Sequence, residues 1–205
     1  MGVNLLQNRR RMALNVKRAM VTWNNFQPPF STELYRPYDS NETTLENAGT
    51  GIVRQTWIGT SFGGYARTFR LIDTAPTVQT DHIYYLSYMF NAQIDGAMFS
   101  AEWGGGLLAP ETPSIANTWV RISDLNNGKK NGYGVVYFLN YRGGTVISTG
   151  FSALAKSPLY VDLTKMFGAG NEPTLAEFER QCRINGIDLT ASHPQDSGTT
   201  REWIY

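Results

Sequence analysis

Short segments of strand-like composition constrain the possible fold of this chain more than any other feature. They begin at Ile52, are rich in Val, Ile, Tyr, Thr and Trp, and are separated by glycine or asparagine clusters, which is typical of antiparallel sheets. The predicted strands are residues 51–58, 65–72, 83–92, 97–103, 119–125, 133–140, 145–151 and 158–163. Because no helices are interleaved with them, the pattern predicts an all-β fold, an antiparallel jelly-roll β-sandwich.

Residues 83–92 show the clearest alternation. One face carries Tyr84, Leu86, Tyr88 and Phe90, and the other carries Ser87 and Asn91. Asp95-Gly96 predicts a two-residue hairpin turn after this strand, because that turn type needs positive φ. Arg142-Gly143-Gly144 predicts a similar turn between 133–140 and 145–151.

A basic amphipathic helix is predicted near the N-terminus, over residues 3–20. The first 32 residues contain no acid, whereas the rest of the chain is mildly acidic, a split typical of a segment that docks onto another molecule. The expected docking site for this helix is a groove on a partner protein, with the apolar face of the helix as the anchor. A membrane and nucleic acid are not the expected partners, because the apolar face lacks tryptophan and one short basic patch binds phosphates weakly. The predicted docking residues are Leu5, Leu6, Arg10, Arg11, Met12, Val16, Lys17 and Arg18.

A second, short helix is predicted near the C-terminus. Thr174 and Glu177 have the spacing of a capping box, in which the threonine hydroxyl accepts the backbone N–H of the glutamate. Leu175, Phe178 and Cys182 follow on one face, so Cys182 is expected to be a small buried core residue.

Length and composition indicate a single folded domain. The chain has 205 residues, of which 41% are hydrophobic and 17% charged, which excludes a disordered protein. A single cysteine cannot form an intrachain disulfide, and no apolar stretch approaches the ~20 residues of a membrane helix. The expected division is a basic anchoring segment at 1–32, a sandwich at 33–190 and a tail at 191–205.

Two glycine-containing motifs match the spacing of known phosphate-binding and catalytic motifs, but neither has the sequence context that such a function needs. Gly168-Ala169-Gly170 has the spacing of a phosphate loop, but Pro173 stands where a dinucleotide loop needs glycine, so a structural corner is expected. The run 59–63 matches the nucleophile elbow around Ser61, yet a strand and not a helix is predicted to follow it. With two isolated histidines, no metal or cofactor site and no catalytic residues are expected.

Aromatic side chains are the most informative candidates for binding. Most are expected to fill the core, and the rest could form a platform for the apolar C–H faces of sugar rings. The candidate sugar-binding residues are Trp103, Trp57, Tyr65 and Trp119. Trp103 is the first choice because a run of three glycines follows it.

One segment resembles a known family. Residues Pro158 to Glu179, "PLYVDLTKMFGAGNEPTLAEFE", resemble the "DLT-x-x-FGAGNEPT-x-x-EF" segment of carbohydrate-binding-module-like β-sandwich domains in structural proteins of tailed phages. Asp81 to Phe90 resembles the central strand of such domains, and Trp119 the tryptophan that opens a later strand. The resemblance spans roughly residues 45–185.

The resemblance implies a non-enzymatic virion component of the tail, baseplate or head decoration. Its sandwich would bind a host-surface glycan or serve as an assembly and spacer module, with other virion proteins as partners and a homo-oligomer as the expected state. Two alternatives stay open. One is a bacterial surface carbohydrate-binding module, and the other is a serine hydrolase that uses Ser61.

Overall fold

The computed structural model describes residues 32, 35–37, 40–59, 69–71, 81–103, 106–107, 110–127, 136–184 and 188–190. The predicted N-terminal helix with its docking residues lies outside these ranges, as do Ser61 and Tyr65. The division into an anchoring segment, a sandwich and a tail therefore stays a prediction.

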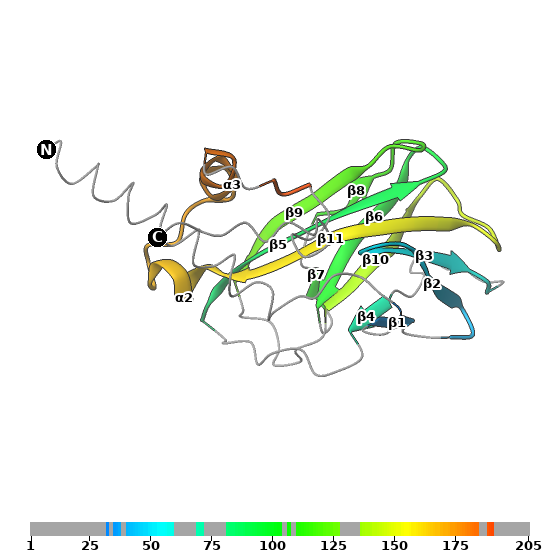
Figure 1. The fold of residues 1–205 in the computed structure, drawn as a ribbon, viewed down its shortest axis with the longest axis horizontal. Helices are drawn as coiled ribbons and strands as arrows, with labels where there is room; N and C mark the ends of the chain where they lie inside the picture. The colour runs from blue at the N-terminus through cyan, green and yellow to red at the C-terminus, as the bar shows by residue number, and fades with distance from the viewer. Residues whose placement is uncertain are drawn as a thin grey trace, which may run out of the picture.

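The described residues form two antiparallel sheets packed face to face (Figure 1). The six-stranded sheet contains β1 (Tyr35–Pro37), β4 (Phe69–Leu71), β10 (Val136–Gly144), β6 (Ala97–Trp103) and β7 (Gly106–Leu107) in that order, with β8 (Thr112–Pro113) paired to β6. The five-stranded sheet has the order β2 (Thr43–Gly49), β3 (Ile52–Trp57), β11 (Ser152–Asp162), β5 (Ile83–Ala92) and β9 (Val120–Asn127). Two short helices follow β11, namely α2 (Leu163–Phe167) and α3 (Leu175–Ile184). The predicted all-β jelly-roll sandwich is confirmed.

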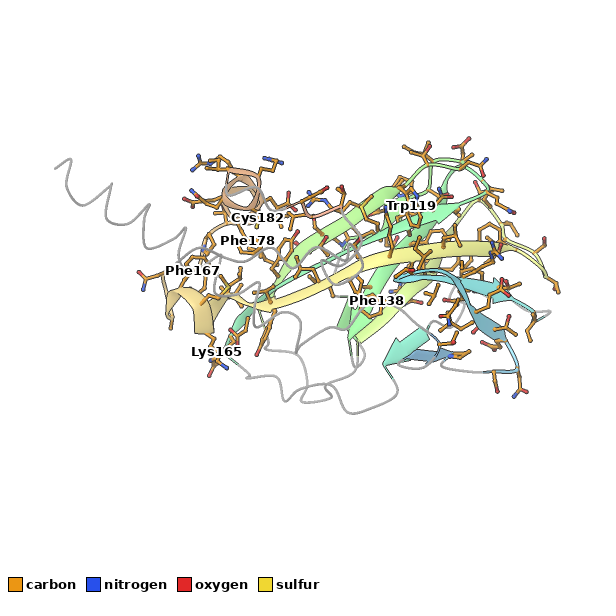
Figure 2. All side chains as sticks on the ribbon, in the orientation of Figure 1. Trp119, Phe138, Lys165, Phe167, Phe178 and Cys182 are labelled. Carbon is orange, nitrogen blue, oxygen red and sulfur yellow. The ribbon has the colours of Figure 1, made fainter. Side chains whose placement is uncertain are left out.

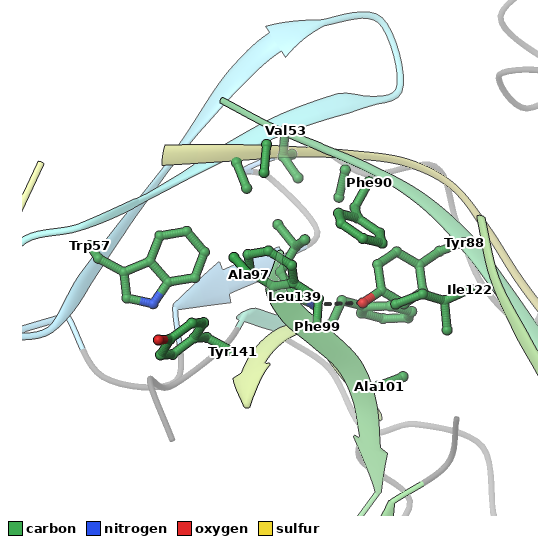
Figure 3. Packing of buried hydrophobic residues seen from close by; sticks show 14 of the residues in the cluster. Val53, Trp57, Tyr88, Phe90, Ala97, Phe99, Ala101, Ile122, Leu139 and Tyr141 are labelled. Carbon is green, nitrogen blue, oxygen red and sulfur yellow. Dashed lines mark hydrogen bonds between the residues drawn. The ribbon is translucent and has the colours of Figure 1, made fainter. Parts of the chain in front are cut away.

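Aromatic side chains fill the space between the two sheets (Figure 3). The predicted inward face of β5 is confirmed, because Tyr84, Leu86, Tyr88 and Phe90 all belong to this core. Ring contacts join the two sheets, with centroids 5.1 Å apart for Phe90 and Phe99 and 5.4 Å apart for Tyr88 and Phe138. Such pairs add to the free energy that burial of their apolar area contributes.

A bulge in β10 is secured by a buried tyrosine. Leu139 has a φ of 52°, where the register between β10 and β6 shifts. The hydroxyl of Tyr88 accepts the backbone N–H of Leu139 at 3.2 Å (Figure 3). It also donates to the carbonyl of Ser100 at 2.9 Å. Complete burial raises the pKa of the Tyr88 phenol far above its ordinary value, so the hydroxyl stays protonated and can donate.

Both predicted hairpin turns are wrong. Asp95-Gly96 follows β5, but β5 and β6 belong to different sheets, so this loop crosses from one sheet to the other. Strand β10 continues through Arg142-Gly143-Gly144. Gly144 is needed for close approach, because its φ is +75° and a Cβ there would lie 2.1 Å from the carbonyl oxygen of Gly96. The predicted strands 145–151 and 158–163 are replaced by a turn and one long strand, β11.

Candidate functional site: the outer face of the five-stranded sheet

A polar cluster joins the end of β11 to the start of β5. Asp162 accepts the backbone N–H of Lys165 at 2.8 Å and thereby caps α2, and its other oxygen binds Nδ1 of His82 at 2.6 Å. Thr164 accepts the N–H of Ile83 at 2.8 Å and donates its hydroxyl hydrogen to Glu172 at 2.5 Å. The Thr164 hydroxyl is the main reason why the pKa of Glu172 lies below its ordinary value.

The glycine run after this cluster is a corner between α2 and α3. Gly168 caps the end of α2 with a φ of +87°, and Gly170 has a φ of +78°. Thr174 then caps α3, because its hydroxyl accepts the N–H of Glu177 at 3.3 Å. The predicted corner is confirmed, but it joins two helices and not the expected strand and helix. This contact of the predicted capping box is also confirmed.

Helix α3 covers one part of the outer face of the five-stranded sheet (Figure 1). Phe178 packs against Tyr85 of β5 with ring centroids 4.7 Å apart, and Cys182 is buried beside them, as predicted. Burial raises the pKa of the Cys182 thiol to about 12, so the thiol stays protonated at neutral pH. We call this part the covered half. Its apolar members are Tyr85, Leu159, Val161, Leu163, Phe178, Cys182 and Leu189.

A charged residue of α3 completes the contact with the sheet. Glu179 accepts hydrogen bonds from Arg121 of β9 at 2.8 Å and from the hydroxyl of Tyr85 at 3.2 Å. The Glu179 and Arg121 side chains are 13% and 23% exposed, so the pair is largely removed from water. Burial raises the pKa of the Tyr85 phenol, which keeps it a donor to the carboxylate.

The same strands continue beyond α3 into a part of the face that the helix does not cover. We call it the open half and define it by Arg54, Met89, Asn91, Trp119 and Lys156. The register places Lys156 beside Met89, and Leu154 beside both Arg54 and Asn91. Paired residues lie on the same face of a sheet, so these side chains share the outer face. Figure 2 shows Trp119 well away from Phe178 and Cys182.

Trp119 and Lys156 meet on this open half. Trp119 immediately precedes β9 and is half-buried, and the Nζ of Lys156 lies 4.6 Å from the centroid of its ring. Met89 lies between Lys156 and Arg121 in the register and is only 6% exposed, although it belongs to the outer face. Lys156 therefore contacts Trp119 through its ammonium group and neighbours the buried Met89 in the register, while Trp119 and Lys156 are themselves only partly buried.

The cations of the outer face differ in their partners. Arg54 pairs with Glu46 at 2.5 Å, and Arg121 pairs with Glu179 at 2.8 Å. Within the described ranges, Lys156 has no carboxylate partner, and its ammonium group contacts the Trp119 ring instead. The open half thus carries one positive charge that no acidic side chain of the described residues neutralises.

The structure describes the side chains of two of the four predicted sugar-binding residues, Trp57 and Trp119. The prediction for Trp57 is wrong, because this residue is 0% exposed and packs in the core, with its ring centroid 5.3 Å from that of Phe151. Trp103 ends β6, and its side chain lies outside the described part. Trp119 is half-buried at the edge of the outer face, where sugar binding stays a prediction. Lys156 was missed because nothing near it in the sequence indicates that Trp119 lies beside it.

The described residues hold no group of three or more His, Cys, Asp or Glu side chains placed to bind a metal ion. Among the same residues, no helix has the length and apolar character needed to cross a membrane.

Comparisons with known proteins give likenesses of fold. No family model matches the chain, and no curated protein matches it. It is similar to the CBM22-1 xylan-binding domain of Xyn10C from Paenibacillus barcinonensis, with a TM-score of 0.44, 9% identity, and coverage of 64% of this chain and 87% of that one. It is also similar to the CBM22-1-GH10 modules of Xyn10B from Clostridium thermocellum, with a TM-score of 0.42, 12% identity, and coverage of 65% and 27%.

A phage protein is also among the similar structures. The enzymatically active domain of tailspike protein 4 from bacteriophage CBA120 matches with a TM-score of 0.35, 8% identity, and coverage of 62% of this chain and 18% of that one. The similar structures thus include carbohydrate-binding modules. Because these TM-scores lie below 0.5, the likenesses assign neither a ligand nor an assembly to this chain.

Proposed function

We propose that this chain is a non-enzymatic structural protein of a tailed-phage virion, whose N-terminal segment docks onto other virion proteins and whose sandwich contacts host-surface glycans. The segment Pro158 to Glu179 carries the proposal, because it resembles the corresponding segment of phage structural modules. Its side chains hold the domain together. Asp162 caps α2, Thr164 binds β5, and Glu179 fixes α3 to the sheet.

The contacts of the same cluster favour a structural role over a catalytic one. A His–Asp pair beside a hydroxyl is the constellation of a hydrolase, and His82, Asp162 and Thr164 supply these three groups. However, the Thr164 hydroxyl donates to Glu172 and accepts from the backbone of Ile83. The hydroxyl hydrogen is therefore directed at Glu172, whereas a triad needs it directed at the histidine that Asp162 orients.

Antibody labelling tests the virion role. Electron micrographs of purified phage particles labelled with antibody to this protein should show gold at one defined place on the particle. Label on the surface of uninfected bacteria, and none on particles, would instead support the alternative of a bacterial surface carbohydrate-binding module.

Deletion of residues 1–25 tests the anchoring segment. The shortened protein should keep the thermal transition of the sandwich, because the two sheets and α3 all lie beyond the deletion. It should no longer join particles. Normal incorporation of the shortened protein would contradict the docking role of Leu5, Leu6 and the basic residues that follow them.

A serine-reactive probe tests the hydrolase alternative. Incubation of the full chain with a fluorophosphonate should leave Ser61 unlabelled, with a known serine hydrolase as the positive control. Stoichiometric labelling of Ser61, abolished in Ser61→Ala, would overturn the non-enzymatic assignment.

A further inference from the structure

The contact between Lys156 and Trp119 bears on which sugars the open half could accept. The ammonium group of Lys156 lies over the indole ring, 4.6 Å from its centroid. A sugar that stacks its C–H face on an aromatic ring uses the same electron-rich surface that attracts the cation. Lys156 and a stacked sugar therefore compete for the face of Trp119 that the ammonium group occupies.

The charge of the ligand decides the outcome of this competition. A neutral sugar that displaces the ammonium group removes its contact with the ring and returns no charge to it. A carboxylate-bearing sugar displaces the same group but gives it an ionic partner, and charge-assisted hydrogen bonds are stronger than neutral ones. Among the described residues, the acids of the outer face do not supply that partner, because Glu46 is engaged by Arg54 and Glu179 by Arg121.

We propose that the open half, through Trp119 and Lys156, is a binding site for carboxylate-bearing sugars. The proposal rests on the glycan contact proposed above and names its site and its ligand class. Trp119 stacks on the apolar face of the sugar ring, and Lys156 binds the carboxylate. Asn91, which is partly buried and pairs with Leu154 on the same outer face, offers a hydrogen-bond donor and acceptor for ring hydroxyls.

Matched pairs of sugars test the ligand class on the full-length chain. One pair is oligogalacturonate and its carboxyl-reduced form, and the other is sialyllactose and its carboxyl-reduced form, so the members of each pair differ only in their carboxylate groups. Calorimetric titration at low ionic strength should show the acidic member of at least one pair bound about fivefold or more tightly than its neutral counterpart, which is the effect of one partly exposed ion pair. This preference should shrink as salt is added.

Two lysine variants test the site. Lys156→Met keeps most of the apolar side chain and removes the charge, and it should abolish the preference for the acidic sugar. Lys165→Met is the matched control, because Lys165 is an exposed lysine on α2, at a distance from Trp119 (Figure 2). The control should keep the preference. Trp119→Ala should weaken binding of the acidic sugar, with circular dichroism confirming that the variant is folded.

Each contrary result would overturn a different part of the proposal. Equal or tighter binding of both neutral sugars would overturn the ligand class and leave glycan binding in place. An equal loss in Lys156→Met and Lys165→Met would show general attraction to a positive protein and overturn the site. Absence of binding by any of the four sugars would overturn both this proposal and the glycan contact, whereas the virion role is judged by antibody labelling alone.

Discussion

The covered half and the open half belong to the same outer face of the five-stranded sheet, yet they are stabilised differently. In the covered half, β5 and β11 present Tyr85, Leu159 and Val161, and α3 buries them. In the open half, the same strands present Met89 and Lys156. The outward-facing residues thus determine where a helix packs on the sheet. Large apolar side chains are buried under a helix, whereas long charged side chains cover the sheet with their own aliphatic stems and keep their charges in water.

The largest difference between the halves should appear on truncation of Phe178. Phe178→Ala removes a ring that is 3% exposed and packs on Tyr85, so the free energy of unfolding should fall by about 3–5 kcal/mol. Ile184→Ala on the same helix is the control, because Ile184 is 64% exposed and its truncation should change this free energy by at most ~0.5 kcal/mol. Urea denaturation measures both. Similar values for the two variants would mean that α3 does not stabilise the covered half.

The ion pairs of the two halves should also differ. Glu179→Gln leaves Arg121 without its charged partner in the covered half, and we expect a loss of about 1–2 kcal/mol. Glu46→Gln removes the partner of Arg54 at the edge of the open half, where the two side chains are 58% and 45% exposed. Its cost should be at most ~0.5 kcal/mol, because water screens an exposed pair. An equal cost for the two substitutions, measured by denaturation at the same salt concentration, would remove this distinction.

Acid should loosen the covered half before the open half. The Thr164 hydroxyl holds the pKa of Glu172 below its ordinary value of 4.5, so Glu172 binds its proton less readily in the folded state than in the unfolded state. The resulting stabilisation is fully present above about pH 4.5 and is lost as the pH falls through the lower, folded-state pKa. Because Glu172 is only partly buried and water still screens it, the effect should be small.

Glu172→Gln tests this acid dependence. The variant should have a flatter dependence of unfolding free energy on pH below about 4.5 than the wild type and a similar dependence above it. Hydrogen exchange of the α2–α3 segment at low pH should rise before that of β2 and β3. Equal acid dependence in the variant and the wild type would show that the bond from Thr164 does not set this pH response.

The strands could be predicted from local pattern, but their partners could not. Residues 83–92 and 97–103 form strands with the predicted bounds, because alternation and β-branched or aromatic side chains are local signals. Asp95-Gly96 supplied the positive φ that its composition predicts, yet the strands on either side belong to different sheets. Strand order depends on packing between distant segments, which a turn dipeptide does not encode.

The long strand β11 begins well before the strand that the sequence predicts at 158–163. Ser157-Pro158 forms a bulge within β11, where Ser157 has a φ of 55° and the register to β5 shifts. The bulge re-sets which side chains face outward, so Lys156 belongs to the open half and Leu159 to the covered half. Trp119 could be named from its residue type, whereas its contact with Lys156 depends on this register across β5.

The smallest expected effect concerns the stability of the open half. Lys156→Met removes the ammonium group from the Trp119 ring but keeps an apolar side chain beside Met89, so the free energy of unfolding should fall by no more than ~0.5 kcal/mol. Denaturation beside Phe178→Ala measures the contrast directly. A loss above ~1 kcal/mol would make Lys156 a structural residue like Glu179, and the two halves would no longer differ in kind. A near-neutral result, together with weaker binding of acidic sugars, would assign Lys156 to recognition, since a residue retained for packing would affect stability first.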